Sequence, residues 1–353
     1  MKQLIAAALL TLAVPALQAQ DVASPDWSSI NLAVTDQHAV PGYTRLAETA
    51  ATLVPAAASL CAAPAADTLT ALQDSYHLAL DAWQGVAHLQ FGPVTYFNWN
   101  YRLQFWPDDN GTGARQLDAL LAAQDLTQLQ AAAFERQSVG VQGFPALERL
   151  LFEDDALAQV QAQPYRCQLI EAIAANLATI AEGIAQRWSG DFRATIASPE
   201  QSGQFENAQD ATVDFYKALV ESVRRYQQQK LEPVLGESLQ QARERRAESW
   251  RSQRSLRNLK LDVAALHHLF TAGTPALSSA LQAADVVAVE AAFASLQQML
   301  APLPDDFLPL LADETGYAQL TALVTGLDTL YEALEASLKR TDLYLGFNSL
   351  DGD

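Results

Sequence analysis

Apolar residues recur along this chain at the three-to-four-residue spacing of amphipathic helices, and runs of β-branched residues are scarce. In residues 35–61, where Thr35 and Asp36 are candidate N-caps, leucines repeat every seven residues at Leu46, Leu53 and Leu60. A second helix is expected over residues 67–89, with one apolar face made of Leu69, Leu72, Tyr76, Leu80 and Trp83. Alanine and leucine, both strong helix formers, are abundant. The pattern predicts an all-α fold.

Further helices are expected from the same pattern at residues 113–122, 126–136, 165–196, 205–231, 248–270, 285–300 and 314–345. The polar segment 198–204 contains a proline and a glycine, and it is the best candidate for a domain boundary. We therefore expect a loose N-terminal arm over residues 20–33, a first helical bundle over residues 34–197 and a second bundle over residues 205–353, side by side.

Residues 90–113 interrupt the helical pattern with Gly92-Pro93, several aromatic residues, Trp106-Pro107 and the turn Asp108-Asp109-Asn110-Gly111. Long ordered loops in compact domains are often functional, so this loop is either the wall of a site or a lid over one end of a bundle. The acidic turn resembles the start of a calcium loop. It lacks an acid near the twelfth position of an EF-hand loop, so ordinary turn chemistry is favoured.

Residues 1–19 have the organisation of a secretory signal, with Lys2, an apolar stretch from Leu4 to Val14, and a plausible cleavage site near Ala19. The apolar stretch is too short to span a bilayer, and we expect no later stretch that is apolar for about 20 residues. The pattern predicts an exported protein of the periplasm or cell envelope that does not span the membrane. In an oxidising compartment, Cys61 and Cys167 favour one disulfide over two buried thiols.

The formal charge of −19, from 41 acidic and 22 basic residues, argues against nucleic acid and anionic membranes as partners, because both would repel the chain. An acidic surface is compatible with binding cations, but it is more often a feature of a soluble surface.

The segment 139–152 contains the most informative local pattern. Gly140 and Gly143 loosen the backbone, and Pro145 suits the first turn of a helix. Glu148 is expected in that first turn, where free N–H groups and the helix dipole favour an anion. Glu148 is therefore either an acid that stabilises the helix start or the central polar group of a site.

The spacing Gly143-x-Pro145-x-x-Glu148 resembles the G-x-H-x-x-E signature of the imelysin (peptidase M75-like) family, with Pro145 at the histidine position. Other segments that resemble the family are Ala82-Trp83-Gln84, Phe91-Gly92-Pro93, Arg102–Asp108, Glu248–Ser252 and Leu345–Asp353. The resemblance implies two four-helix-bundle-like domains with the motif near their interface, and an association with iron-regulated periplasmic proteins. The family name implies a peptidase, but the His/Glu pair cannot form here, so we assign no catalytic residues.

Other catalytic patterns are missing from the sequence. It contains no His-Glu-x-x-His, its five histidines do not complete a zinc ligand set, and it has no Gly-x-Ser-x-Gly motif. His38 is the histidine with the best claim to bind a metal, together with Glu148. The competing interpretation of His38 is a surface or capping residue.

A basic cluster stands out in this acidic chain, because seven basic residues and only two acids lie between Arg243 and Lys260. Arg251, Arg254 and Arg257 have i, i+3 spacing, which would place them on one helical face. That face is either solvated or directed at the first bundle. Because a guanidinium suits a buried carboxylate, we expect Arg102, Glu148 and one of Arg251 or Arg254 to form a polar cluster between the bundles. Trp106, Ser252 and Ser255 would lie around it.

We interpret the chain as a non-catalytic imelysin-like periplasmic protein, linked to iron uptake or iron regulation, that binds a small ligand, a metal or an envelope protein at the Glu148 site. Iron or another divalent cation is the candidate cofactor. The alternatives are an M75-type peptidase and an interaction module without a ligand. A pocket with converging polar groups favours binding, a metal set or nucleophile–base pair favours a peptidase, and an exposed apolar patch favours an interaction module.

Overall fold

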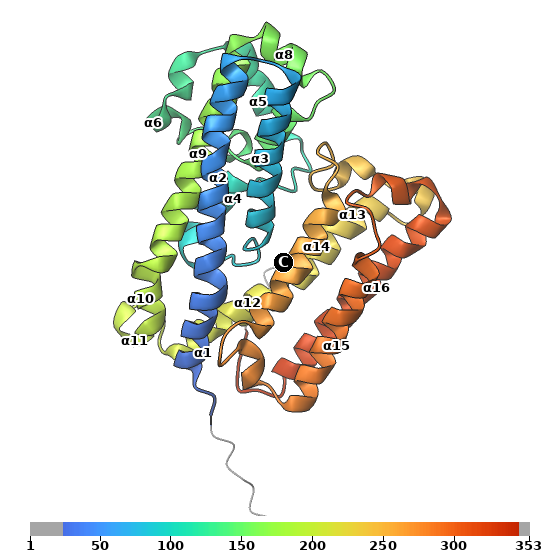
Figure 1. Ribbon diagram of the computed structural model, residues 1–353. Helices are drawn as coiled ribbons and strands as arrows, with labels where there is room; N and C mark the ends of the chain where they lie inside the picture. The colour runs from blue at the N-terminus through green and yellow to red at the C-terminus, as the bar shows by residue number, and fades with distance from the viewer. Residues whose placement is uncertain (1–23, 346–353) are drawn as a thin grey trace, which may run out of the picture.

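The computed structural model describes residues 24–345, so the signal predicted over residues 1–19 and the end of the tail motif, residues 346–353, lie outside the described residues. Within that range the chain forms helices and connecting segments, and no strands, as the hydrophobic pattern predicted (Figure 1). The helices fall into two sets that lie side by side. We call them the N-terminal and C-terminal sets, and their status as separate domains stays a prediction.

The N-terminal set is built around three long helices, because α2 packs along both α9 and α3. Figure 1 shows these helices running nearly parallel. The set comprises α1 (Trp27–Val34), the π-helix η1 (Thr35–Ala39), α2 (Val40–Ala62), α3 (Ala66–Gln84), the 3-10 helix η2 (Gly92–Asn98), α4 (Trp99–Leu103), α5 (Thr112–Ala123), η3 (Leu126–Leu129), α6 (Ala131–Phe134), η4 (Val139–Val141), α7 (Phe144–Leu151), α8 (Ala156–Ala162), α9 (Pro164–Ser189), α10 (Asp191–Ala197) and α11 (Pro199–Ser202).

The C-terminal set packs α16 against α15 and α12, with α14 beside α15. It comprises α12 (Ala208–Arg225), the π-helix η5 (Tyr226–Leu231), α13 (Glu232–Leu235), η6 (Leu239–Gln241), η7 (Glu244–Arg246), α14 (Ser255–Thr271), η8 (Leu277–Ala280), α15 (Ala283–Leu300), η9 (Leu308–Ala312) and α16 (Glu314–Leu338). The two sets touch where α1 meets α12 and where α3 meets α14.

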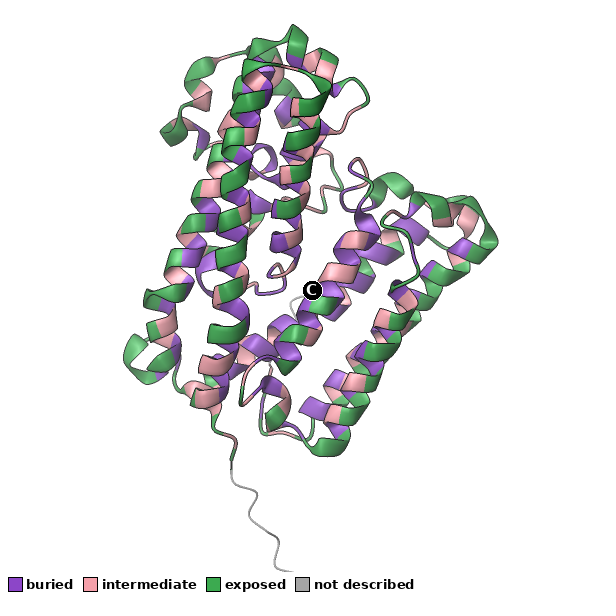
Figure 2. Cartoon of the chain, viewed as in Figure 1, coloured by how far each residue is buried: buried purple, intermediate pink, exposed green. Residues whose placement is uncertain are grey.

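The predicted apolar faces form the core. Leu46, Leu53 and Leu60 of α2 are fully buried, and so are Leu72 and Leu80 of α3. Figure 2 shows buried and exposed positions alternating along the long helices. Burying a leucine side chain contributes about 1.5–3 kcal/mol relative to leaving it exposed, so these stripes hold the long helices together.

The predicted disulfide is present, because Cys61 at the end of α2 is bonded to Cys167 in α9 with a Cα–Cα distance of 5.4 Å. The bond links the two helices that pack most extensively in the N-terminal set.

Residues 164–197, which include α9 and α10, are apolar and long enough to cross a membrane by length and composition, whereas the sequence pattern led us to expect no such stretch after the signal. Within the most apolar 18 residues of this stretch, 50% are buried inside the protein. Because α9 packs against α2, the apolar side chains serve the core of the N-terminal set.

The predicted loose arm over residues 20–33 was wrong from Trp27 onward. Asp26 caps α1 by accepting the N–H of Ser29 at 3.1 Å, and Ile30 and Val34 are buried. These two residues are four positions apart, so they lie on one helical face. The helix therefore begins before the candidate caps Thr35 and Asp36, and η1 carries it into α2 without a break.

The helix predicted from residue 248 was also wrong at its start, because α14 begins only at Ser255. Residues 247–254 form a turn in which Ser249 and Gln253 have φ values of 53° and 54°. Residues other than glycine rarely adopt this left-handed region, which no continuous α-helix contains. Arg251, Arg254 and Arg257 therefore do not share a helical face, and we refer to this segment as the 247–254 turn.

Removal of the disulfide is expected to lower the free energy of unfolding by about 2–4 kcal/mol, since the bond closes a loop of 106 residues and restricts the unfolded chain. The double variant Cys61→Ala/Cys167→Ala should therefore unfold at a lower urea concentration than the oxidised protein. Reduced wild-type protein is the matched control and should unfold near the same midpoint as the variant. Equal midpoints for oxidised and reduced protein would contradict this expectation.

Candidate functional site

A cavity of about 640 Å³ lies between the two helix sets. Its walls come from the loop before α5, from the start of α7, from η5 and α13, and from residues 245–251. The residues that line it include Trp106, Pro145, Glu148, Arg245, Arg246, Trp250 and Arg251. Pro145, Glu148, Trp106 and Arg251 were all expected from the sequence to lie near one another.

The start of α7 places Glu148 at this cavity. Pro145 lies in the first turn of α7, as predicted. A Cβ at Gly143 would stand 2.3 Å from the carbonyl oxygen of Leu103, so only glycine allows the helix start to pack this closely. Because α7 begins at Phe144, Glu148 lies in the second turn, and the expected position in the first turn was wrong. The helix dipole is not what holds this carboxylate.

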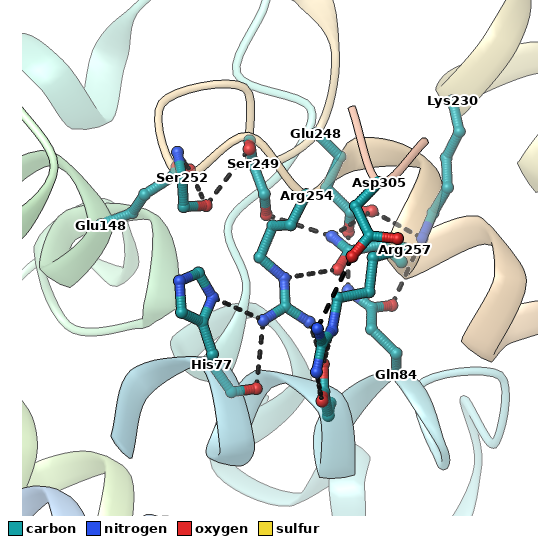
Figure 3. A network of polar contacts seen from close by, with 12 residues as sticks. His77, Gln84, Glu148, Lys230, Glu248, Ser249, Ser252, Arg254, Arg257 and Asp305 are labelled. Carbon is teal, nitrogen blue, oxygen red and sulfur yellow. Dashed lines mark hydrogen bonds and ion pairs between the residues drawn. The ribbon is translucent and has the colours of Figure 1, made fainter. Parts of the chain in front are cut away.

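Glu148 is held by the C-terminal set instead. Its Oε1 accepts the backbone N–H of Ser252 at 2.9 Å and the Ser252 hydroxyl at 2.6 Å (Figure 3). The 247–254 turn makes this contact possible, because it leaves the Ser252 N–H outside any helix. Burial raises the pKa of Glu148, while the two Ser252 hydrogen bonds and the charge of Arg251 act in the opposite direction. Both Ser252 hydrogen bonds end on Oε1, and Glu148 is one of the residues that line the cavity.

Arg102 was expected beside Glu148, but the structure places its guanidinium in another network. Its Nε donates to Gln142 at 2.7 Å and its Nη2 to Asn176 at 3.0 Å. An ion pair with Glu135 at 3.6 Å completes its contacts. Arg102 lies in α4, and its side chain reaches toward α9. The predicted three-part cluster is therefore corrected by removing Arg102.

Arg254 and Arg257 face the N-terminal set, as one interpretation of the basic cluster predicted, but their partner is Asp81 of α3. Arg254 is 1% exposed and is ion-paired with Asp81. It also donates to the His77 carbonyl at 3.1 Å, and Arg257 donates to Asp81 at 2.5 Å. Burial alone would raise the pKa of Asp81, but the two arginines outweigh burial and lower it. Ser255 likewise turns away from Glu148 and donates to the carbonyl of Glu248 at 2.7 Å.

A buried charged cluster beside this pair was not anticipated. The Lys230 ammonium lies 2.7 Å from the Glu248 carboxylate and 2.5 Å from that of Asp262. Glu248 also accepts from Gln84 of α3 at 3.1 Å and from Asn258 at 3.0 Å (Figure 3). A signal was present in the sequence, because Asp262 falls on the same helical face as the buried Leu259 and Leu266.

The pKa values of the two carboxyl groups in this cluster shift in opposite directions. Burial and the nearby charge of Glu248 raise the pKa of Asp262 to about 7 despite Lys230. One oxygen of Asp262 has no hydrogen-bond partner among the described residues. Burial would also raise the pKa of Glu248, but Lys230, Asn258 and Gln84 outweigh it and lower that pKa.

The structure does not bring His38 and Glu148 together, so they form no common metal ligand set. His38 is buried, and its Nδ1 lies 2.7 Å from Nδ1 of His268 while its Nε2 lies 2.8 Å from Nε2 of His88. The two ring nitrogens of His38 point in opposite directions, so the three histidines form a hydrogen-bonded chain between the sets. Burial, together with the neighbouring His268, lowers the pKa of His38 to about 3.

Other candidate metal ligands serve the fold. Asp108 accepts the N–H groups of Thr112 and Gly113, both at 2.8 Å, and thereby caps α5. Turn chemistry is confirmed there. Across residues 24–345, no group of three or more histidine, cysteine or acidic side chains is arranged to hold a metal ion.

The fold and the cavity define an all-α protein of two adjoining helix sets with a polar pocket between them. The chain belongs to the imelysin family (peptidase M75), whose model matches residues 39–334. Iron-regulated protein A of Synechococcus elongatus is 23% identical over 315 residues, which covers 85% of this chain and 82% of that protein.

Two crystal structures share the fold. An imelysin-like protein from Psychrobacter arcticum 273-4 superposes with a TM-score of 0.73 at 22% identity, over 91% of this chain and 97% of the other. A putative iron-regulated protein A precursor from Parabacteroides distasonis superposes with a TM-score of 0.72 at 14% identity, over 90% and 97% of the two chains.

The Arg254–Asp81 pair should be important for stability. Replacing Arg254 by Met should lower the free energy of unfolding by about 2 kcal/mol, because its buried contacts to Asp81 and the His77 carbonyl are lost while Arg257 still pairs with Asp81. Lys339→Met is the control, since Lys339 is 74% exposed and its loss should cost less than about 1 kcal/mol. Urea unfolding measures both variants, and a loss at Arg254 no larger than at Lys339 would show that the pair is dispensable.

The histidine chain should make stability depend on pH. The pKa of His38 in the folded protein, about 3, lies below the ordinary histidine value of 6.5, so the unfolded state binds more protons as pH falls below 6.5. The contribution of neutral His38 is therefore complete above about pH 6.5 and shrinks as pH falls, by about 2 kcal/mol between pH 7 and pH 5. Asp262 acts in the opposite sense, because its raised pKa favours the folded state as pH falls.

A comparison of variants separates the two groups. His38→Gln should lose less stability between pH 7 and pH 5 than wild type, whereas His267→Gln should follow wild type, because His267 contacts Glu290 and Phe293 outside the chain of three. The measurement is the urea midpoint at each pH. Identical pH dependence in wild type and His38→Gln would remove His38 as the cause.

Proposed function

We propose that this chain is an exported, non-catalytic imelysin-like protein that works in iron-linked physiology by binding a small ligand in the cavity around Glu148. The observation that carries the proposal is the cavity itself. It is about 640 Å³, within the range of small-molecule sites, and residues from both helix sets line it. A buried carboxylate, several guanidinium groups and two indole rings converge on one space, as expected for a site that orients a ligand.

The link to iron and to export rests on the relatives. Two of them are named as iron-regulated protein A, and one of these is described as a precursor. The signal-like pattern of residues 1–19 agrees with export to the periplasm or cell envelope. The Cys61–Cys167 disulfide is compatible with such an oxidising compartment.

Iron would enter this cavity as a complex with its ligand. The acidic side chains of the cavity are Asp108, Asp109 and Glu148, and Asp108 is already engaged by the start of α5. A carboxylate from the ligand would supply the oxygen atoms that a hard metal ion requires.

Binding of an envelope protein is an alternative to binding a small ligand, and it would use a surface away from the cavity. Phe97 in η2 and Tyr101 in α4 are 66% and 55% exposed, and these side chains would contact the partner.

A hydrolase is the second candidate function, in line with the family name. It is favoured by one contact, the 2.6 Å hydrogen bond from the Ser252 hydroxyl to a buried carboxylate whose pKa is raised. A nucleophile next to a base is the arrangement that covalent catalysis needs. The backbone N–H of Ser252 donates to the same oxygen, so this contact also joins the two helix sets. Peptide cleavage that Ser252→Ala abolishes would favour the hydrolase.

Retention of iron tests the binding proposal. Iron(III) supplied as its citrate complex should stay with the wild-type protein through gel filtration, at about one iron per chain by elemental analysis. Glu148→Gln should retain at least about tenfold less, because a carboxylate that lines the cavity loses its charge. Glu332→Gln is the control, since Glu332 lies exposed on α16. Equal retention by wild type and Glu148→Gln would remove Glu148 from the site.

A further inference from the structure

Three arginines from one short segment line the cavity. Arg245, Arg246 and Arg251 line the cavity, and none makes a side-chain hydrogen bond or ion pair within the described part of the chain. Arg149, on the opposite wall, is paired with Asp118 and Glu153. The chain has 41 acidic residues against 22 basic ones, so three such arginines at one cavity are a local excess of positive charge.

Two of these arginines are placed by an aromatic ring. The guanidinium carbon of Arg251 lies 4.3 Å from the centre of the Trp250 ring, and that of Arg245 lies 5.3 Å from it. Stacking on an indole holds a guanidinium in place while its N–H groups remain available at the edge of the plane. The Trp250 ring therefore orients the guanidinium groups of Arg245 and Arg251 at the cavity, where their N–H groups have no acceptor within the described part of the chain.

The local charge favours an anion. Burial lowers the pKa of Arg251, and Arg149 and Arg245 act in the same direction, so neighbouring positive charges disfavour one another. Glu148 opposes them in part, but its Oε1 is already bound by Ser252. Asp108 caps α5, which leaves Asp109, exposed at the rim, as the remaining acid of the cavity. A bound anion would satisfy the free N–H groups and reduce the repulsion.

We propose that the ligand of this cavity is a small organic anion whose carboxylate groups are bound by Arg245, Arg246 and Arg251, with its apolar part against Trp250 and Trp106. This inference rests on the proposed function, since it names the chemical class for the same cavity. Carboxylates match the planar fork of a guanidinium through two parallel hydrogen bonds. A free cation would meet three unpaired positive charges and be repelled.

Citrate without metal is the probe for this assignment. Calorimetric titration at constant ionic strength should show citrate binding to the wild-type protein, and Arg251→Gln should weaken it by at least about tenfold. Arg246→Gln should weaken it in the same direction. Arg243→Gln removes the same charge from the same segment, but Arg243 does not line this cavity, so its effect should stay within about twofold. The urea midpoint of each variant verifies folding.

Three results would overturn the assignment: no citrate binding at about 10 mM, a concentration well above ordinary ligand affinities, equal weakening by Arg243→Gln and Arg251→Gln, or tighter binding of inorganic phosphate than of citrate. The outcome is separable from that of the iron experiment. Iron retention that depends on Glu148, with citrate affinity indifferent to Arg251, would leave the proposed function and remove the anion class. Arg251-dependent citrate binding without iron retention would remove the link to iron and leave the anion site.

Discussion

Buried ion pairs and hydrogen bonds across the boundary fix the position of the two helix sets relative to each other. Arg254 of the C-terminal set is paired with Asp81 of α3, and Glu248 accepts a hydrogen bond from Gln84 while it binds Lys230. Apolar surfaces can slide with little change in energy, whereas a buried charge that loses its partner is costly. These contacts therefore favour the placement of the two sets in which every one of these charges keeps its partner. The cavity is lined by residues of both sets in this placement.

One short segment serves both the interface and the cavity. Within the 247–254 turn, Glu248 and Arg254 bind the N-terminal set, Ser252 binds Glu148, and Trp250 and Arg251 line the cavity. Left-handed backbone at Ser249 and Gln253 allows neighbouring side chains to point in these different directions. We infer that changes in ligand contact and changes in the packing of the two sets are coupled through this turn.

The helices, the leucine faces and the Cys61–Cys167 bond could be predicted because they depend on local periodicity and composition. The partners of the arginines could not, since i, i+3 spacing places residues on one face only in a helix, and residues 247–254 form a turn. Glu148 was singled out from its place after Pro145, and Ser252 was expected near it. The hydrogen bond from the Ser252 backbone N–H could not be predicted, because it depends on a turn where a helix was expected. The pairing of His38 with His88 and His268 depends on contacts between distant segments, so spacing along the chain did not indicate it.

The central claim is that the space between the helix sets, bounded by Glu148 on one side and Arg251 on the other, is where this protein holds its ligand. A crystal structure grown with saturating iron(III) citrate, with anomalous diffraction recorded at the iron edge, tests it most directly. The account predicts an iron peak inside this cavity and ligand density in contact with the Arg251 guanidinium. Iron and citrate bound only elsewhere, with this cavity filled by water alone, would contradict it.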